Sequence, residues 1–364
     1  MTPSISRMVA ARRQELAYPA RLFSIANFMR YERPQRGRER EFWQLNADIF
    51  GATGPLADAE IIELGYEILK AFGAKKPMYT IKVNDRRVID AMMHDYLLLD
   101  PIQSELMVKL FDRKNKISNE EFRDQAIDIF GPDKAADGLK KIAGLLVARQ
   151  IDELPKEIAD NPAVDELKHL FSILKKRHIT NAAFDITLMR GFDYYTGTVF
   201  EFFDEDPENN RAMFGGGRYD GLVGLFGAEP ISAVGIAPGL STVELFLTSH
   251  NLLPELSSTT EVYVAVLGAD QLEGAQELVT KLRAEGVNAE LDISGRKLDK
   301  QIKTAVKKQI PYLMFVGEEE LKKEKYNLKD TATSEEETLS FERLVTRVKD
   351  RRRKAGDNSD DLFE

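Results

Sequence analysis

The densest group of charged side chains lies between residues 30 and 41, RYERPQRGRERE. Five arginines and three glutamates give this segment a charge of +2, although the whole chain has a formal net charge of −9. Guanidinium groups bind phosphate oxygens in pairs, so the segment predicts a site for a polyphosphate or an RNA end. A solvated hairpin with cross-strand ion pairs would have the same composition, and the residues alone leave both interpretations open.

Strand periodicity places the polar side chains of this region on common faces, because alternate residues of a strand share a face. The two predicted sets are Phe28, Arg30 and Glu32 in a first strand, and Phe42, Gln44, Asn46 and Asp48 in a second strand. Arginine, carboxylate, amide and aromatic groups would therefore face one surface.

A second candidate segment is LMRGFDYYTGTVFEFF at 188–203, which carries Arg190 and the adjacent Tyr194 and Tyr195. Adjacent tyrosines usually serve packing, but their hydroxyls also bind polar ligands beside a charged pocket. The residues alone favour packing.

A third candidate is FGGGRYDGL at 214–222, where three consecutive glycines would let the backbone approach a ligand closely. It lacks the spacing of a phosphate-binding loop or of a dinucleotide site, so by itself it predicts a tight turn. Downstream, AVGIAPGLSTVEL at 233–245 predicts a glycine-containing strand that enters a helix, whose first amides could face a site.

The elements that must position these groups predict an α+β fold. Residues 1–250 mix strands and helices without regular alternation, which indicates an antiparallel sheet with flanking helices and a helical insertion at about 101–180. A linker at 251–260 precedes a β-α-β-α-β unit at 261–350 that is typical of a small parallel-sheet α/β domain. The end, 351–364, is expected to be a charged, disordered tail.

Composition excludes several classes of protein. The absence of cysteine excludes disulfides and thiolate metal sites, and the four histidines lack the spacing of metal ligands, so we predict no protein metal site. No apolar run reaches the length of a membrane span, and the N-terminal residues lack the apolar core of a secretory signal. We expect a cytoplasmic protein without a membrane partner.

Three segments in order, RYERPQRGRER…FWQ, LMRGFDYYTGTVFE and GGGRYDGL, resemble histidyl-tRNA synthetases, which are class II aminoacyl-tRNA synthetases. The resemblance extends over nearly the whole chain, because residues 262–348 are similar to the anticodon-binding domain of that family. It implies a class II antiparallel sheet followed by the small α/β domain.

The resemblance implies an ATP site in the first segment. Arg30 would hold the α-phosphate, Glu32 the adenine amino group and Arg38 the β- and γ-phosphates, while Phe42 would stack on the adenine.

It also implies a histidine pocket. The matching residues are Thr2, Gln44, Asp48, Tyr194 and Tyr195, together with Arg190 between the histidine carboxylate and the α-phosphate. The backbone of Gly215, Gly216 and Gly217 would line the adenylate site.

The implied reaction is histidine–tRNA ligation. Histidine and ATP, with Mg²⁺ on the phosphates, would form histidyl-adenylate, and the histidyl group would pass to tRNA(His). The family also implies a homodimer.

Two departures from the family pattern affect these expectations. In that family, the glycine-containing strand that enters a helix (233–245 here) is motif 3, and it is followed by an arginine that clamps ATP. Thr242 stands at the position of this arginine, so either another basic residue replaces it or ATP binds more weakly. The family sequence Arg-Pro-Glu-x-Thr would place its threonine at Thr2 and its glutamate before Met1. We therefore expect a chain truncated before or within motif 1, with impaired activity.

Two alternatives stay open. One is a synthetase-like regulatory paralogue of histidine biosynthesis, which the missing arginine favours and the C-terminal domain opposes. The other is a noncatalytic tRNA-binding protein.

Overall fold

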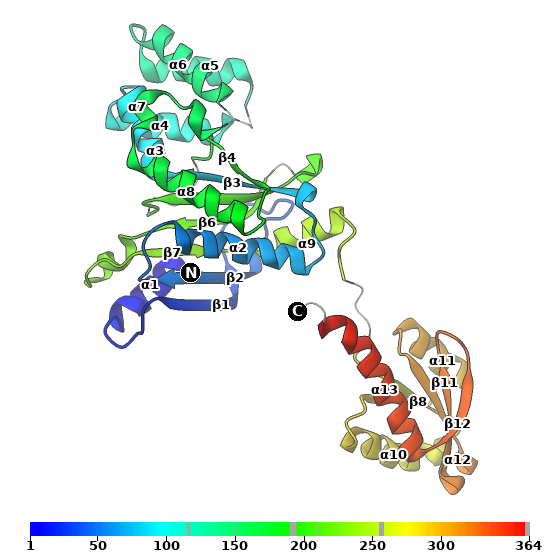
Figure 1. Cartoon of the computed structure of the whole chain (residues 1–364). Coiled ribbons are helices and arrows are strands. Elements are labelled where there is room, and N and C mark those ends of the chain that lie inside the picture. Colours follow the sequence, from blue (N-terminus) through cyan, green and yellow to red (C-terminus); the bar gives the residue numbers. More distant parts are fainter. Residues whose placement is uncertain (115–116, 149, 190–193, 210, 255–257, 361–364) are drawn as a thin grey trace. The chain divides into compact units, whose positions relative to one another are not determined.

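The chain divides into two units, Met1–Leu253 and Pro254–Glu364. The computed structural model describes residues 1–114, 117–148, 150–189, 194–209, 211–254 and 258–360 (Figure 1).

The first unit is built on a seven-stranded sheet with the order β1-β2-β7-β6-β5-β3-β4. All neighbouring strands are antiparallel except β3 and β4, which run parallel. The strands are β1 (Ala20–Met29), β2 (Glu41–Phe50), β3 (Tyr79–Asp85), β4 (Ala182–Phe184), β5 (Thr198–Asp204), β6 (Ala212–Arg218) and β7 (Ala233–Ile236). This antiparallel sheet with flanking helices confirms the predicted α+β class.

The two faces of β2 serve different purposes. Ala47 and Ile49 belong to the main core with Ile61 and Ile62 of α2 (Pro55–Ala71). Phe50 instead packs with Val9 of α1 (Thr2–Ala11) and with Tyr219 in a smaller cluster. Because side chains alternate along a strand, Phe42, Gln44, Asn46 and Asp48 share the face of Phe50, away from α2.

The prediction that Arg30 and Glu32 continue the first strand is wrong. β1 ends at Met29, and the chain then forms a tight turn in which Gln35 and Arg38 pair. Pro34 has no N–H to give to a strand ladder, and Gly37 has a φ of 69°, which a turn of this kind requires.

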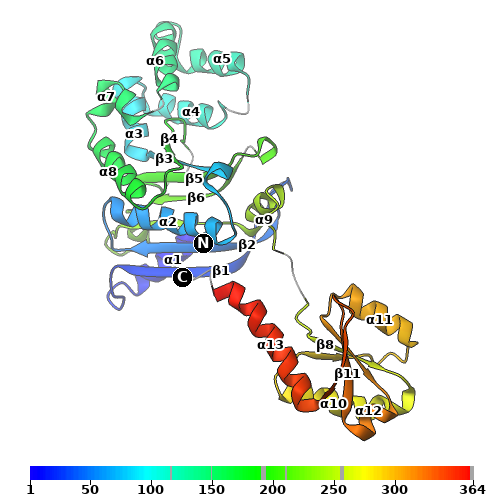
Figure 2. The ribbon, with the colours of Figure 1, turned by 45° about the vertical axis from the view of Figure 1, so that its right-hand side comes forward.

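Further helices complete the unit, and Figures 1 and 2 show most of them grouped beyond the β3–β4 side of the sheet. They are α3 (Arg86–Ala91), α4 (Pro101–Asp112), α5 (Asn119–Phe130), α6 (Ala135–Val147), α7 (Lys156–Ala159), α8 (Pro162–Lys176) and α9 (Leu240–Ser249). α5 begins at a capped end, since the Ser118 hydroxyl accepts a hydrogen bond of 3.0 Å from the Glu121 amide. α8 packs against α2, and α9 packs against β2 and β6.

The second unit has its own five-stranded sheet, ordered β12-β11-β10-β8-β9. The expected parallel strands are β8 (Val262–Val266), β9 (Ala289–Leu291) and β10 (Tyr312–Val316). Two antiparallel strands that the sequence did not predict extend the sheet, β11 (Lys325–Asp330) and β12 (Glu336–Ser340). The helices are α10 (Leu272–Ala284), α11 (Leu298–Lys307), α12 (Glu318–Lys323) and α13 (Phe341–Asp360).

The expectation of a disordered tail from residue 351 is wrong as far as residue 360, because α13 continues to Asp360. Arg351 donates to Asp330 at 2.7 Å, and Arg352 bonds Glu261 and donates to the Gly286 carbonyl at 2.7 Å. These contacts hold the helix against its own unit.

The described residues contain neither a membrane-spanning helix nor a clustered metal site. None of their helices is long and apolar enough to cross a membrane. The same part of the chain contains no group of three or more His, Cys, Asp or Glu side chains placed to hold a metal ion.

Candidate active site

A cavity of about 420 Å³ opens where the turn after β1 meets β6 and α9. It is lined by Arg30, Gln35, Arg36, Gly37, Arg38, Phe42, Gln44, Asp204, Glu208, Asn209, Arg211, Ala212, Met213, Ala237, Gly239, Ser241, Thr242 and Leu245. We call it the arginine cavity. Three of the four residues expected to bind ATP, all but Glu32, line it together with Gln44.

Arg30 and Phe42 form one stacked pair in this cavity. The guanidinium carbon of Arg30 lies 4.2 Å from the centre of the Phe42 ring, and its Nε donates to the Glu39 carbonyl at 2.9 Å. Partial burial, followed by the nearby charge of Arg38, lowers the pKa of Arg30. Positive charge is therefore crowded here, as an anion-binding site requires.

Glu32 and Arg38 bind each other. Arg38 Nη2 donates to Glu32 Oε1 at 2.7 Å and Nε donates to Oε2, which makes a bidentate pair. The hydrogen bond from Arg38 lowers the pKa of Glu32. The two side chains lie together, and the guanidinium of Arg38 is hydrogen-bonded to the carboxylate of Glu32 and not directed to the cavity alone.

A second cluster gathers around Asp48 on the same face of β2, and we call it the tyrosine cluster: Thr2, Asp48, Tyr194, Tyr195 and Tyr219. The Tyr219 hydroxyl donates to Asp48 Oδ1. Tyr194 packs edge-to-face on both other tyrosines, with ring centres 5.1 and 5.9 Å apart, and is hydrogen-bonded to Thr2. Four residues expected in the histidine pocket therefore meet here.

Asp48 is buried, and Tyr219 and Gly235 adjoin its carboxylate. Burial raises the pKa of Asp48 to about 6, although the hydrogen bond from Tyr219 opposes this shift. In the paired strand β7, a Cβ atom on Gly235 would lie only 2.1 Å from Asp48 Oδ1. Glycine at this position is therefore required by the carboxylate.

Asn46 lies on β2 between Gln44, which lines the arginine cavity, and Asp48 of the tyrosine cluster. Gln44 Nε2 donates to Asn46 Oδ1 at 2.7 Å. Asn46 is buried, and its amide nitrogen has no hydrogen-bond partner among the described residues. At about 3.3 Å per residue, Gln44 and Asp48 are roughly 13 Å apart along the strand.

Packing within the sheet explains why β6 has three glycines, because a larger side chain at each position would meet a neighbouring group. A Cβ on Gly215 would lie 2.5 Å from the Phe200 carbonyl, and one on Gly216 would lie 2.0 Å from the Gly235 carbonyl. Only Gly217 adjoins a site residue, since its Cβ would lie 2.9 Å from the Tyr195 ring. The described lining of the arginine cavity includes none of the three.

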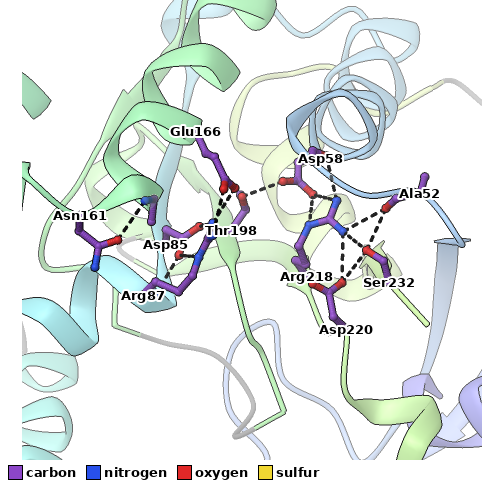
Figure 3. A network of polar contacts seen from close by, with 12 residues as sticks. Ala52, Asp58, Asp85, Arg87, Asn161, Glu166, Thr198, Arg218, Asp220 and Ser232 are labelled. Carbon is purple, nitrogen blue, oxygen red and sulfur yellow. Dashed lines mark hydrogen bonds and ion pairs between the residues drawn. The ribbon is translucent and has the colours of Figure 1, made fainter. Parts of the chain in front are cut away.

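A buried ion pair fixes the strand end from which Tyr219 projects (Figure 3). Arg218 donates to Asp58 at 2.6 and 2.9 Å, to Ser232 at 2.5 Å and to the Gly54 carbonyl at 3.0 Å. Thr198 donates to the other oxygen of Asp58 at 2.8 Å. This network ties α2, β5 and the end of β6 together.

Sequence reasoning missed Tyr219, Gly235, Arg36 and Arg211 as site residues. Tyr219 and Gly235 stand inside the segments singled out above, but only the strand pairing shows that both meet Asp48. Arg211 comes to the cavity from a distant part of the sequence, which no local pattern reveals. Arg190 lies outside the described residues.

The chain matches two family models, a histidyl-tRNA synthetase model over residues 1–243 and an anticodon-binding domain model over 261–351. It is 38% identical to a histidine–tRNA ligase of Leptospira biflexa over 96% of this chain and 80% of that protein. It is 32% identical to a histidine–tRNA ligase of Halobacterium salinarum over 93% of this chain and 78% of that protein.

The fold is also that of a solved histidyl-tRNA synthetase from Nostoc. That structure matches with a TM-score of 0.77 at 23% identity, over 95% of this chain and 81% of that chain. Sequence and fold agree, and the chain belongs to the histidyl-tRNA synthetase family.

Proposed function

We propose that the chain is a histidine–tRNA ligase that activates L-histidine with ATP and transfers the histidyl group to tRNA(His). One observation carries the proposal: one face of β2 joins the arginine cavity at Phe42 and Gln44 to the tyrosine cluster at Asp48. An adenylate has an aromatic base and phosphates at one end and an amino acid at the other, and this face offers a partner for each.

ATP, which brings Mg²⁺ as part of the substrate, would occupy the arginine cavity. Phe42 would stack on the adenine and Arg30 would hold the α-phosphate. Arg38 would leave Glu32 to bind the β- and γ-phosphates, which frees the Glu32 carboxylate to accept the adenine amino group. The bidentate Glu32–Arg38 pair supports this exchange, because it holds both groups ready beside the cavity.

Histidine would bind in the tyrosine cluster. Asp48 would accept a hydrogen bond from the imidazole N–H, while the tyrosines enclose the ring. The free amide N–H of Asn46 and the side chain of Gln44 lie toward the phosphate end, where they can bind the polar groups of the amino acid. The backbone of Gly215, Gly216 and Gly217 would then line the adenylate, with Gly217 nearest to Tyr195.

In the first step, a histidine carboxylate oxygen would attack the α-phosphorus of ATP, and the bond to pyrophosphate would break. Arg30, and Arg190 as the family resemblance implies, would stabilise the negative charge that grows on the phosphoryl oxygens. Positioning of the two substrates on one strand face supplies much of the remaining acceleration.

In the second step, the 3′ end of tRNA(His) would take the histidyl group. The second unit matches an anticodon-binding model, and Lys300, Lys303 and Lys307 of α11 are exposed and available for phosphate contacts. The presence of this unit supports the ligase over a regulatory paralogue.

We also propose a homodimer that uses the free side of β1. This strand is the edge of its sheet and exposes Phe23, Ile25 and Met29, which are 77%, 64% and 81% exposed. An apolar edge strand of this kind is a ready surface for self-association.

Aminoacylation of a tRNA(His) transcript with labelled histidine tests the proposal. We expect charging that requires ATP, histidine and the matching tRNA. Binding of the tRNA without any charging would support the noncatalytic RNA-binding alternative instead.

A further inference from the structure

The arginine cavity concentrates positive charge in an acidic chain. Among the described residues, four arginines line it, against the two carboxylates of Asp204 and Glu208. The N-terminus of α9 also opens on it, with Gly239, Ser241 and Thr242 in the lining and no acidic residue in the first turn. Backbone amides at a helix start and clustered guanidinium groups both favour phosphate.

We propose that Arg211 binds the β- and γ-phosphates of ATP and supplies the positive charge that Thr242 does not. This inference rests on the ATP site proposed above. It adds a substrate-binding residue from the connection between β5 and β6, which neither the motifs nor the family resemblance assigned.

Arg211 differs from the other arginines of the cavity in its partner. Arg38 is paired with Glu32, and Arg36 Nη1 lies 3.4 Å from Glu208. Arg30 Nε lies 3.9 Å from the Glu32 carboxylate. Arg211 Nη1 donates to the neutral amide oxygen of Gln35 at 2.6 Å, and no carboxylate of the described residues forms an ion pair with it. Its charge is therefore the least compensated in the cavity.

Thr242 does not bind phosphate in this way, because its hydroxyl and its methyl group both contact other parts of the protein. Its hydroxyl donates to the Met213 carbonyl at 2.6 Å, in reach also of the Gly239 carbonyl at 2.9 Å. Its methyl group packs toward the turn, 3.5 Å from where a Cβ on Gly37 would lie. The first turn of α9 is thus fitted against the turn at Gln35–Arg38 without contributing a cation.

The bond between Arg211 and Gln35 joins two loops that both line the cavity. Gln35 belongs to the turn after β1, whereas Arg211 immediately precedes β6. A guanidinium can bind phosphate through two parallel hydrogen bonds between opposite charges, whereas the amide oxygen of Gln35 is neutral and accepts one bond from Arg211. An incoming polyphosphate would therefore take Arg211 from Gln35 and tie both loops to the nucleotide.

The test compares Arg211→Gln with Arg211→Lys in histidine-dependent ATP–pyrophosphate exchange on the full chain. We expect Arg211→Gln to raise the KM for ATP about tenfold or more and to leave the KM for histidine unchanged. Arg211→Lys keeps the charge and should recover part of the affinity. Arg123→Gln, which changes an exposed arginine of α5 outside the cavity, is the matched control and should change neither constant.

Gln35→Ala distinguishes the effect of the Arg211 charge from the effect of the hydrogen bond that links Arg211 to Gln35. If Arg211 acts on phosphate, Gln35→Ala removes the tie but keeps the guanidinium, so its KM for ATP should stay well below that of Arg211→Gln. If Gln35→Ala reproduces the effect of Arg211→Gln, the role is structural and the inference is overturned. An unchanged KM for ATP in Arg211→Gln overturns it as well.

Calorimetric binding of ATP and of AMP keeps the inference separate from the proposed function. We expect Arg211→Gln to weaken ATP and not AMP, because AMP lacks the β- and γ-phosphates. A chain that binds ATP in this Arg211-dependent way but shows no exchange would contradict the proposed function alone. A chain that binds no ATP would contradict both.

Discussion

At the scale of single residues, the account depends on side chains whose environment changes their chemistry. Asp48 is the clearest, since burial holds its pKa at about 6 while Tyr219 donates to it and Gly235 makes room for it. A carboxylate with this pKa is ionised at neutral pH but loses its charge in mild acid. It therefore accepts a hydrogen bond from a neutral imidazole most strongly above about pH 6, where Asp48 is ionised.

This gives a pH prediction for the histidine site. Below about pH 6, Asp48 is protonated, and a neutral carboxyl group accepts the imidazole N–H more weakly than a carboxylate does, so kcat/KM for histidine in pyrophosphate exchange should fall by up to tenfold per pH unit. Free histidine also titrates near pH 6.5. Asp48→Asn should keep the pH dependence that comes from free histidine and lose the pH dependence that comes from Asp48. Identical profiles for the two proteins would remove Asp48 from imidazole recognition.

The order of groups along β2 gives a second prediction. Gln44→Ala should raise the KM for histidine about two- to tenfold, as expected for the loss of one hydrogen bond, and raise the KM for ATP less. Phe42→Ala is the matched change at the adenine end and should do the reverse. The two constants are measured in the same exchange assay, and a selective rise for ATP in Gln44→Ala would contradict the assignment.

At the scale of elements, the site depends on how strand ends are held. The Arg218–Asp58 pair is almost fully buried, with side chains 6% and 4% exposed, and it fixes the residue before Tyr219. Burial raises the pKa of Asp58, and the charge and hydrogen bonds of Arg218 oppose this rise. Removal of the arginine alone would leave a buried carboxylate without its counter-charge.

We therefore expect Arg218→Met to lower the free energy of unfolding by about 3–5 kcal/mol. The loss should be smaller at pH 5 than at pH 8, because Asp58 without its partner takes up a proton as the pH falls. Arg21→Met breaks the exposed Arg21–Glu60 pair and should cost far less, because solvent screens an exposed ion pair. Urea unfolding measures both, and equal losses would contradict the claim that burial gives the Arg218 pair its importance.

Sequence reasoning found the elements with strong apolar patterns and missed those without them. The buried runs VYVAV and YLMFV predicted β8 and β10, and alternation predicted β2. KYNLKD and EETLS are charged or polar at most positions, so β11 and β12 gave no apolar signal. The ion pairs of Arg351 and Arg352 join residues far apart in sequence, which is why a charged helix end was mistaken for a tail.

The site was predictable to the extent that its residues share a segment. Phe42, Gln44 and Asp48 follow from strand periodicity, and the family resemblance added Thr2 and the tyrosines. The Glu32–Arg38 pair, the contact of Tyr219 with Asp48 and the position of Arg211 depend on tertiary packing. None of these could be read from local spacing.

At the scale of the whole molecule, two units with separate cores combine a catalytic fold and an anticodon-binding fold in one chain. This arrangement matches a reaction whose substrate is activated at one site and attached to a large RNA. The exposed apolar edge at β1 adds a surface through which two such chains could pair.

The proposed dimer is tested by sedimentation velocity over a range of concentrations. We expect a concentration-dependent dimer that Ile25→Arg weakens, because a charge on the edge strand opposes pairing. Ile102→Arg, at an exposed isoleucine of α4, is the matched control and should leave the dimer unchanged. Equal effects of the two substitutions would show that β1 is not the interface.

The most direct test of the central claim is ATP–pyrophosphate exchange with each of the twenty amino acids in turn. We expect exchange with histidine only, and a much lower rate of that exchange in Asp48→Asn at neutral pH. Exchange with a different amino acid, or no exchange with histidine while the folded chain binds ATP, would contradict the claim that this site makes histidyl-adenylate.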